Sequence, residues 1–211
     1  MLFIDREDAA KRLLSWLEPY AKKPGIVLAI PRGGVAIGYH IAKKFGLPLE
    51  LLFTKKIGHP LSSELAVGAV SLSDYIVDPQ FEMPDTYIRQ QVAKIRKNLE
   101  ERNKKFLGEN YSQSDLKNKT VIIADDGIAT GNTVLAAIQL VRHASPARIV
   151  VAAPVSAEEA AFKIRQKADD FVCLNVASDF LGVGQFYRDF SEVSDAEVER
   201  LLNDLKQTNT I

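Results

Sequence analysis

Two adjacent acids, Asp125 and Asp126, are the residues whose type and spacing best suit chemistry in this chain. They directly follow an apolar run over residues 121–124, which is typical of a buried strand. Ionised carboxylates accept strong hydrogen bonds, so a pair of them at the end of a strand suits the hydroxyls of a sugar. Their negative charge would also stabilise a cationic transition state at that sugar.

The seven residues after the acids suit a phosphate group. Most are small or carry hydroxyls, and a helical pattern begins among them, so their backbone N–H groups lack intrahelical acceptors. Those donors and the positive end of the helix dipole favour a phosphate dianion. Asp-Gly alone is also a common turn and Thr133 could be an ordinary helix cap, but the order of strand, acids, loop and helix is more specific. The predicted 5-phosphate-binding residues are Gly127, Ile128, Ala129, Thr130, Gly131, Asn132 and Thr133.

Two further loops could hold a second anion such as pyrophosphate. Arg32, Gly33 and Gly34 follow the first predicted strand and open a helix, although a glycine pair there is often only a tight turn. Lys55 and Lys56 follow the second predicted strand, and the alternative for them is a solvated surface turn. In open α/β sheets, ligands bind beyond the carboxyl ends of the strands, so the loop at Arg32 and the loop after Asp126 are expected to face each other across one cleft.

The spacing of apolar residues predicts an α/β fold, with a mainly parallel twisted sheet flanked by helices. Strands alternate with helices along most of the chain, which implies right-handed crossovers. We expect a loop over residues 55–63, a polar connector over residues 108–118 and one domain over residues 1–211. The predicted strands cover residues 26–30, 49–54, 65–72, 120–124, 148–153 and 170–174, and the predicted helices cover residues 5–20, 35–45, 85–107, 131–144, 157–167 and 195–206.

Composition narrows the class of protein. The 27 basic and 27 acidic residues give a formal net charge of zero, which argues against a protein that coats nucleic acid. Neither a secretory signal nor an apolar stretch long enough to span a bilayer is visible, so we expect a cytoplasmic protein without membrane contact. Cys173 is the only cysteine and lies in an apolar run, which predicts a buried structural thiol. We expect no metal site built from the protein's own ligands alone, because no Cys/His set has the spacing of one.

The segment over residues 121–133 lacks the Gly-Lys-Ser/Thr of a P-loop and the G-x-G-x-x-G of a dinucleotide site. It resembles the phosphoribosyl-diphosphate signature of type I phosphoribosyltransferases: four apolar residues, two acids, then small residues and threonines. The resemblance implies that Asp125 and Asp126 contact the ribose hydroxyls and that residues 127–133 cradle the 5-phosphate. It also implies a pyrophosphate loop over residues 31–34, often with an unusual cis peptide, and a mobile catalytic loop near Lys56–Glu64. A diphosphate substrate would largely bring Mg²⁺ with it.

The resemblance covers most of residues 1–205. Pro-Arg-Gly-Gly, Lys-Lys-Ile-Gly, Gly-Ala-Val and a closing Phe-Tyr-x-Asp-Phe are similar to a stand-alone bacterial and archaeal group of predicted phosphoribosyltransferases. In such proteins a small hood, often built from a terminal segment, covers the acceptor, and a homodimer is common. Phe186 and Tyr187 are therefore the candidate acceptor-binding residues, and ordinary packing of the tail on the sheet is the alternative.

The leading functional hypothesis is a Mg²⁺-dependent transferase. It would move the 5-phosphoribosyl group from 5-phosphoribosyl 1-diphosphate to a nitrogen of a small, nucleobase-like acceptor and release pyrophosphate. The expected catalytic residues are Asp125, Asp126 and Lys55. The alternative is a non-catalytic regulator that senses phosphoribosyl diphosphate or a nucleotide. The lack of a helix-turn-helix pattern argues against direct nucleic-acid binding by such a regulator. A hydrolase of phosphorylated sugars is disfavoured, because no nucleophile constellation is present.

Overall fold

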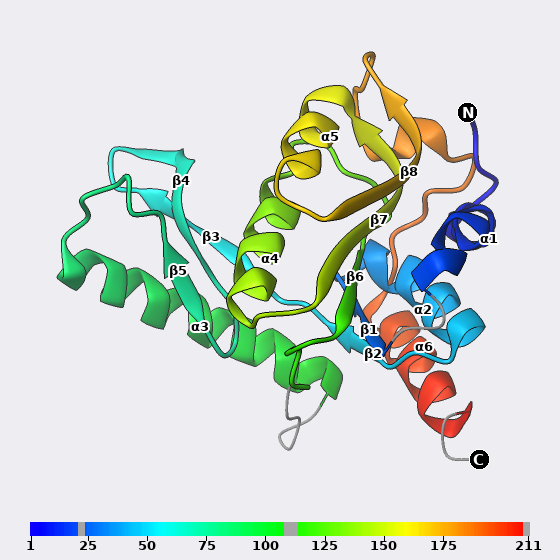
Figure 1. Ribbon diagram of the computed structural model, residues 1–211, viewed down its shortest axis with the longest axis horizontal. Helices are drawn as coiled ribbons and strands as arrows, with labels where there is room; N and C mark the ends of the chain where they lie inside the picture. The colour runs from blue at the N-terminus through cyan, green and yellow to red at the C-terminus, as the bar shows by residue number, and fades with distance from the viewer. Residues whose placement is uncertain (21–23, 108–113, 209–211) are drawn as a thin grey trace.

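A parallel sheet lies at the centre of the structure, a computed structural model that describes residues 1–20, 24–107 and 114–208 (Figure 1). Among these residues, the sheet has five strands: β1 (Gly25–Ala29), β2 (Leu49–Leu51), β6 (Thr120–Ala124), β7 (Arg148–Ala157) and β8 (Asp170–Ala177). Their order is β2-β1-β6-β7-β8, and each neighbouring pair is parallel. The apolar residues of β1 and β6 are buried, as expected for continuous apolar runs covered on both faces.

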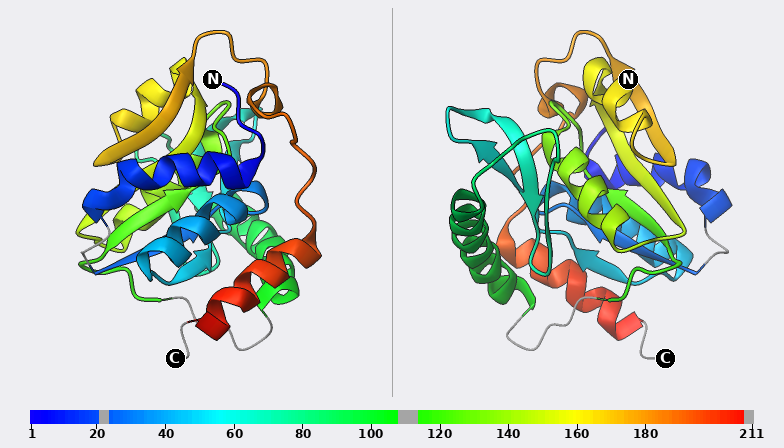
Figure 2. Two further views of the ribbon diagram at one scale, coloured as in Figure 1. Left: turned by 90° about the vertical axis from the view of Figure 1, so that its right-hand side faces the viewer. Right: turned by 60° about the vertical axis from the view of Figure 1, so that its left-hand side comes forward.

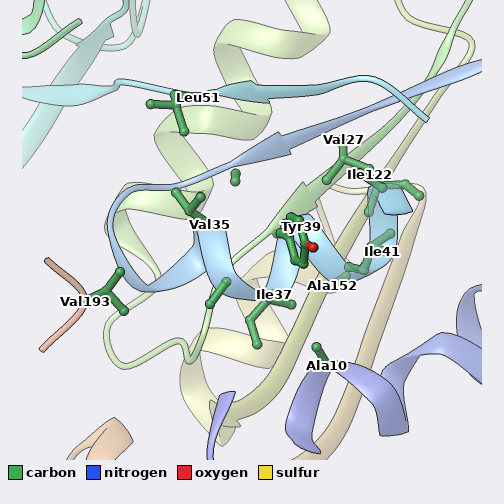
Figure 3. Close-up of a cluster of buried hydrophobic side chains, with 14 of the residues drawn as sticks. Ala10, Val27, Val35, Ile37, Tyr39, Ile41, Leu51, Ile122, Ala152 and Val193 are labelled. Atoms are coloured by element: carbon green, nitrogen blue, oxygen red, sulfur yellow. The ribbon is translucent and has the colours of Figure 1, made fainter. Parts of the chain in front are cut away.

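Helices cover both faces of this sheet, which confirms the predicted α/β fold. They are α1 (Arg6–Leu17), α2 (Gly33–Phe45), α4 (Asn132–His143) and α5 (Glu158–Arg165). Successive residues of a strand face opposite sides. Val27 and Ile122 accordingly pack with α1 and α2, whereas Leu28 and Ile123 pack with α4 and α5. Figure 2 shows helices on both faces of the sheet. Figure 3 shows the side chains of α2 gathered beside Val27 and Ile122.

A smaller antiparallel sheet stands beside the main one, on the left of Figure 1. It consists of β3 (Lys55–His59), β4 (Ser62–Val70) and β5 (Tyr75–Val77). The long helix α3 (Asp85–Leu107) contacts β3 and β4, and α6 (Asp195–Thr208) contacts α2 and α3. In the part of the chain that the structure describes, no helix is long and apolar enough to cross a membrane.

The prediction of a loop over residues 55–63 is wrong, because most of this segment forms a β-hairpin. β3 pairs with β4, and only Pro60 and Leu61 form the turn between them. Glycine and proline suggested a loop, but the pairing accommodates Gly58 through register shifts on both sides of it. Ile57 is fully buried, so the hairpin also contributes to the hydrophobic core.

Strands β7 and β8 both continue beyond the predicted ends at residues 153 and 174. Pro154 lacks a backbone N–H, so it cannot donate a hydrogen bond to a neighbouring strand. The strand nevertheless continues, because Val155 and Ala157 pair with Asn175 and Ala177. The predicted helix over residues 85–107 and the predicted strand over residues 120–124 are confirmed. The polar connector falls partly on residues 108–113, which lie outside the described residues.

Candidate functional site

A cavity of about 210 Å³ opens where β6 leads into α4. It is lined by Asp125 and residues 127–134, which are one of the two predicted acids and the whole predicted phosphate loop. The Leu135 N–H donates to the Gly131 carbonyl at the start of α4. The N–H groups of residues 132–134 come before this bond and lack helical acceptors, which suits an anion. Gly131 has a φ of 76°, a left-handed conformation that glycine adopts without strain.

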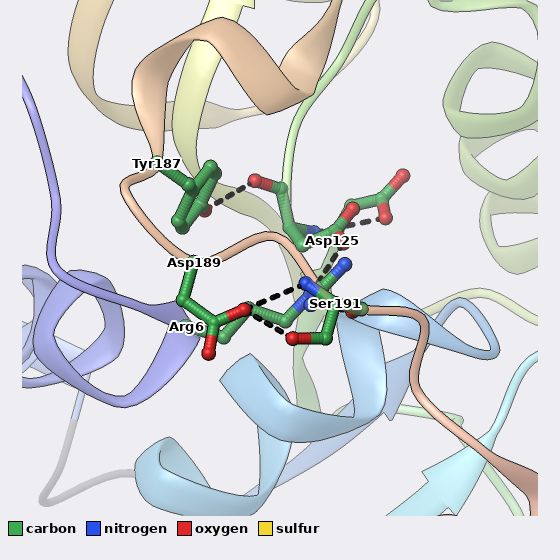
Figure 4. A network of polar contacts seen from close by, with 6 residues as sticks. Arg6, Asp125, Tyr187, Asp189 and Ser191 are labelled. Carbon is green, nitrogen blue, oxygen red and sulfur yellow. Dashed lines mark hydrogen bonds and ion pairs between the residues drawn. The ribbon is translucent and has the colours of Figure 1, made fainter.

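The two acids have different surroundings. Figure 4 shows Asp125 in a network of polar contacts with Arg6 and Tyr187 nearby. Asp125 lines the cavity, and its Oδ1 accepts a 2.9 Å hydrogen bond from the Asp126 N–H. Asp126 does not line that cavity. Its Oδ2 lies 2.8 Å from Nε of Arg6, and each side chain of this ion pair is only 13% exposed. The sequence predicts the same role for both carboxylates, contact with the ribose hydroxyls, but in the structure only Asp125 lines the cavity and Asp126 pairs with Arg6.

The predicted pyrophosphate loop lies directly against the acids. The peptide bond between Pro31 and Arg32 is cis, as the resemblance implies. A β-carbon added to Gly33 would meet Asp126 Oδ2 at 1.9 Å, and one added to Gly34 would meet the backbone of β6 at 2.5 Å. Only glycine permits so close an approach at these two positions. The structure thus brings together the loop after β1 and the acids after β6, which are far apart in the sequence.

The Arg32 side chain is held by acids from the C-terminal part of the chain. It forms an ion pair with Glu192 and a second one, at 3.6 Å, with Asp195. The Arg32 side chain is 36% exposed, and ion pairs at such exposure are individually weak. A pyrophosphate could therefore displace both carboxylates and take the guanidinium as a bidentate partner.

Residues 186–193, here called the C-terminal strap, join the N-terminal segment next to the acids. The Phe3 N–H donates to the Phe186 carbonyl and the Arg188 N–H donates to the Phe3 carbonyl, both at 2.8 Å. The Tyr187 hydroxyl donates to the Asp126 carbonyl at 2.6 Å. The strap therefore links the N-terminus of the chain to the loop that carries the acids.

Phe186 and Tyr187, the predicted acceptor-binding residues, are buried in this structure. They are 7% and 5% exposed. The ring of Phe186 packs on Phe180 at a centroid distance of 5.3 Å, and the ring of Tyr187 packs on Phe3 at 5.5 Å. Burial of large aromatic surfaces stabilises the fold, so core packing accounts for both residues. In this conformation, little of either side chain is accessible to a ligand.

Lys55 and Lys56 lie in a different place from the acids. They line a groove of about 700 Å³ between the β3–β4 hairpin and α3, together with His59. The Tyr87 hydroxyl donates to the Gly58 carbonyl at 2.6 Å and so fastens the hairpin to α3. In this conformation, neither lysine is among the residues that line the Asp125 cavity.

Burial is the largest cause of the pKa shifts of Asp125, Tyr187 and Cys173. It raises the pKa of Asp125 well above its usual range, and the neighbouring charge of Asp126 raises it further. Burial also raises the pKa of the Tyr187 phenol, so this hydroxyl remains a donor. The half-buried Cys173 thiol has a pKa raised to about 11 by burial, which fits a structural role. Within the described residues, no group of three or more His, Cys, Asp or Glu side chains could hold a metal ion.

Sequence reasoning missed Arg6, Glu192 and Val183. Arg6 lies at the start of an amphipathic helix, where a charged residue is ordinary, and its partner is 120 positions away. Glu192 likewise lies in a polar stretch. Val183 lies so close to Gly127 that a β-carbon there would be 2.3 Å from Val183 Cγ1. No local motif marks any of these residues, because each acts through a tertiary contact.

Comparison with known proteins gives the family. The model of a family described as "Phosphoribosyl transferase domain" matches residues 4–191, so the chain belongs to this family. A Mycobacterium tuberculosis protein named as a candidate phosphoribosyl transferase is 33% identical over 211 residues. That alignment covers 96% of this chain and 46% of the relative. The chain therefore spans about half the length of the curated relatives it matches.

Two solved structures are similar over nearly the whole chain. TT1426 from Thermus thermophilus is 34% identical, with a TM-score of 0.88, and the match covers 97% of this chain and 99% of that one. A hypothetical protein from Neisseria gonorrhoeae with bound ppGpp is 13% identical, with a TM-score of 0.52, over 97% of this chain and 98% of that one. The second likeness concerns the fold alone.

Proposed function

We propose that this chain transfers the 5-phosphoribosyl group from 5-phosphoribosyl 1-diphosphate to a nitrogen of a nucleobase-like acceptor. The observation that carries the proposal is the cavity that joins Asp125 to the start of α4, beside the glycine loop at Gly33. An anion site, a carboxylate and a second glycine loop in one region match three parts of one ligand: its phosphate, its ribose hydroxyls and its diphosphate. Membership of the phosphoribosyl transferase domain family supports the same activity.

The chemistry needs positioning more than it needs a nucleophile on the protein. The start of α4 would hold the 5-phosphate, and Asp125 would accept hydrogen bonds from the ribose hydroxyls. The bond between ribose C1 and the diphosphate oxygen breaks, and its electron pair leaves with pyrophosphate. The acceptor nitrogen forms the new bond to C1 with its lone pair and loses a proton to solvent. The fixed charge of the acids favours the cationic ribosyl group between these two events.

Mg²⁺ suits the oxygen donors of this site. The ion keeps several waters and needs only one or two carboxylates besides the phosphate oxygens of a substrate. Asp125, which lines the cavity, would help to hold it. The ion would neutralise charge that develops on the departing pyrophosphate.

Arg32, Lys55 and Lys56 are the proposed partners of pyrophosphate. Arg32 would exchange its two carboxylate partners for the diphosphate. The two lysines would reach the same ligand through a movement of the β3–β4 hairpin toward the cavity, and such closure would also exclude water.

The test combines binding with turnover. Calorimetry with phosphoribosyl diphosphate and Mg²⁺ should show binding by the wild-type protein and by Asp179→Asn, a change of an exposed acid, but much weaker binding by Asp125→Asn. Pyrophosphate release is then measured across purine and pyrimidine bases, and at least one base should support it. Binding without turnover on any base would instead support a regulator that senses this ligand. No binding at all by the wild-type protein would rule out both.

A further inference from the structure

Asp126 is held in place through three of its own groups, and Figure 4 labels the three residues that contact them: Arg6, Tyr187 and Asp125. Its carboxylate pairs with Arg6 at 2.8 Å, and its carbonyl accepts the Tyr187 hydroxyl at 2.6 Å. Its N–H donates to Asp125 Oδ1 at 2.9 Å. The first two contacts come from the N-terminal helix and from the C-terminal strap, and the third leads directly to the acid that lines the cavity.

Two further contacts, with Ser191 and Phe190, hold the Arg6 side chain in place, so its pairing with Asp126 is more than a surface contact. A terminal nitrogen of its guanidinium donates to the Ser191 carbonyl at 2.7 Å, and the guanidinium lies 4.1 Å from the centroid of the Phe190 ring. Both side chains of the Arg6–Asp126 pair are 13% exposed. Removing one partner of a pair buried in this way leaves an uncompensated charge. Drawing Asp126 away from Arg6 would therefore cost a ligand a large part of its binding free energy.

The space around the Asp126 carboxylate is also filled on the side of the pyrophosphate loop. Gly33 lies so close that a β-carbon there would come within 2.8 Å of both carboxylate oxygens. Asp125 is different, because one of its oxygens accepts the Asp126 N–H and because Asp125 is one of the residues that line the cavity. The two acids therefore differ in what a sugar could reach.

We propose that the adjacent acids have separate tasks: Asp125 accepts the ribose hydroxyls, and Arg6 with Asp126 forms a positioning pair that orients the Asp125 carboxylate. The N–H of Asp126 is the link, since it fixes one oxygen of Asp125 and leaves the other to the ligand. The inference rests on the proposed function, and it assigns to Arg6 a part in ligand binding although Arg6 does not line the cavity.

The test compares ribose 5-phosphate with 2,3-dideoxyribose 5-phosphate, which keeps the phosphate and lacks both hydroxyls. Calorimetry gives the two dissociation constants, and their ratio measures recognition of the hydroxyls. The variants are Asp125→Asn, Asp126→Asn, Arg6→Ala, Arg6→Lys and the double variant of Arg6→Ala with Asp126→Asn. Lys11→Ala is the control, because Lys11 lies on the same helix and pairs with the exposed Glu7. Melting temperatures are recorded for every variant.

Asp125→Asn should bring the ratio close to one. Asp126→Asn and Arg6→Ala should each weaken ribose 5-phosphate binding by about tenfold and leave binding of the dideoxy analogue near the wild-type value, so that the ratio falls part of the way toward one. The double variant should be no weaker than either single variant. Arg6→Lys should recover part of the loss, and Lys11→Ala should bind as the wild type does. A merely structural role would lower the melting temperature without this non-additive loss of affinity.

Two results would overturn the inference while the proposed function stands. One is a ratio in Asp126→Asn as low as in Asp125→Asn together with an unchanged ratio in Arg6→Ala, which would show that the Asp126 carboxylate contacts the sugar itself. The other is wild-type affinity in Arg6→Ala. If the wild-type protein binds neither ribose 5-phosphate nor phosphoribosyl diphosphate, the proposed function and this inference are both wrong.

Discussion

The carboxylate of Asp126 occupies the space that a side chain at position 33 would need, since a β-carbon on Gly33 would lie 1.9 Å from Asp126 Oδ2. This contact joins the loop after β1 to the loop after β6, at neighbouring strands of the parallel sheet. An aspartate side chain could ordinarily rotate away from such a clash. Here it cannot do so freely, because Arg6 holds the same oxygen at 2.8 Å.

Gly33→Ala should therefore damage both the fold and the site. Forcing one additional carbon into a filled space costs about 1–3 kcal/mol of unfolding free energy, and binding of phosphoribosyl diphosphate should weaken in parallel. Urea unfolding and calorimetry measure the two effects. Gly182→Ala is the matched control, because Gly182 has an extended backbone and nothing lies within 4 Å of an added β-carbon. Equal stability of the two variants would contradict the close contact.

Asp125→Asn should lower activity and raise the stability of the ligand-free protein at neutral pH. Loss of a charged acceptor for the ribose hydroxyls should reduce kcat/KM by about 10- to 100-fold. Burial raises the pKa of Asp125, so the folded state keeps its proton at pH values where the unfolded chain has lost it. Stability therefore falls as pH rises from the unfolded pKa of about 3.9 toward the higher folded pKa, and asparagine abolishes this loss.

The measurement for Asp125→Asn is urea unfolding of the variant and the wild type at pH 4 and at pH 7.5. The variant should be the more stable protein at pH 7.5, and its advantage should shrink at pH 4, where aspartate is neutral in the folded state. Asp179→Asn, at an exposed position, should show no such dependence. An advantage of the same size at both pH values would point to packing instead of charge.

The main sheet and the phosphate loop were predictable because their signals are local. Residues 121–124 form a continuous apolar run before Asp125, and such a run identifies a strand buried on both faces. The hairpin over residues 55–63 was not predictable in this way. Its glycine and proline are typical of loops, and the strand forms because β4 supplies a partner and Ile57 finds a place in the core.

The division between the two acids could not be predicted from the sequence. Asp125 and Asp126 are identical in type and adjacent, and only tertiary contacts distinguish them. Arg6 stands 120 positions from Asp126, and nothing in an amphipathic helix indicates which charged residue turns inward. The burial of Tyr187 has the same cause, since its partner Phe3 comes from the opposite end of the chain.

Glu192→Gln should strengthen the binding of inorganic pyrophosphate, because it removes a carboxylate that pairs with Arg32. Exposed ion pairs contribute about 0.2–1 kcal/mol, so the gain in affinity should be roughly 1.4- to fivefold. Calorimetry at constant ionic strength measures it. Glu199→Gln removes the same charge from an exposed position on α6 and should leave the affinity unchanged. A similar gain in both variants would mean that net charge, and not release of Arg32, is responsible.

Lys55→Ala should lower kcat and leave the fold intact. Lys55 is exposed, so its removal should change the unfolding free energy by no more than about 0.5 kcal/mol. If the β3–β4 hairpin brings this cation to the departing pyrophosphate, kcat should fall by about tenfold while the KM for phosphoribosyl diphosphate changes little.

Lys94→Ala separates this closing movement from a static role of the groove. Lys94 lines the same groove as Lys55, but it belongs to α3 and would not travel with the hairpin. Steady-state kinetics of the two variants should therefore differ, with kcat reduced only in Lys55→Ala. Equal losses of kcat in both variants would show that the groove acts as one charged surface, and an unchanged kcat in both would remove the hairpin from the reaction.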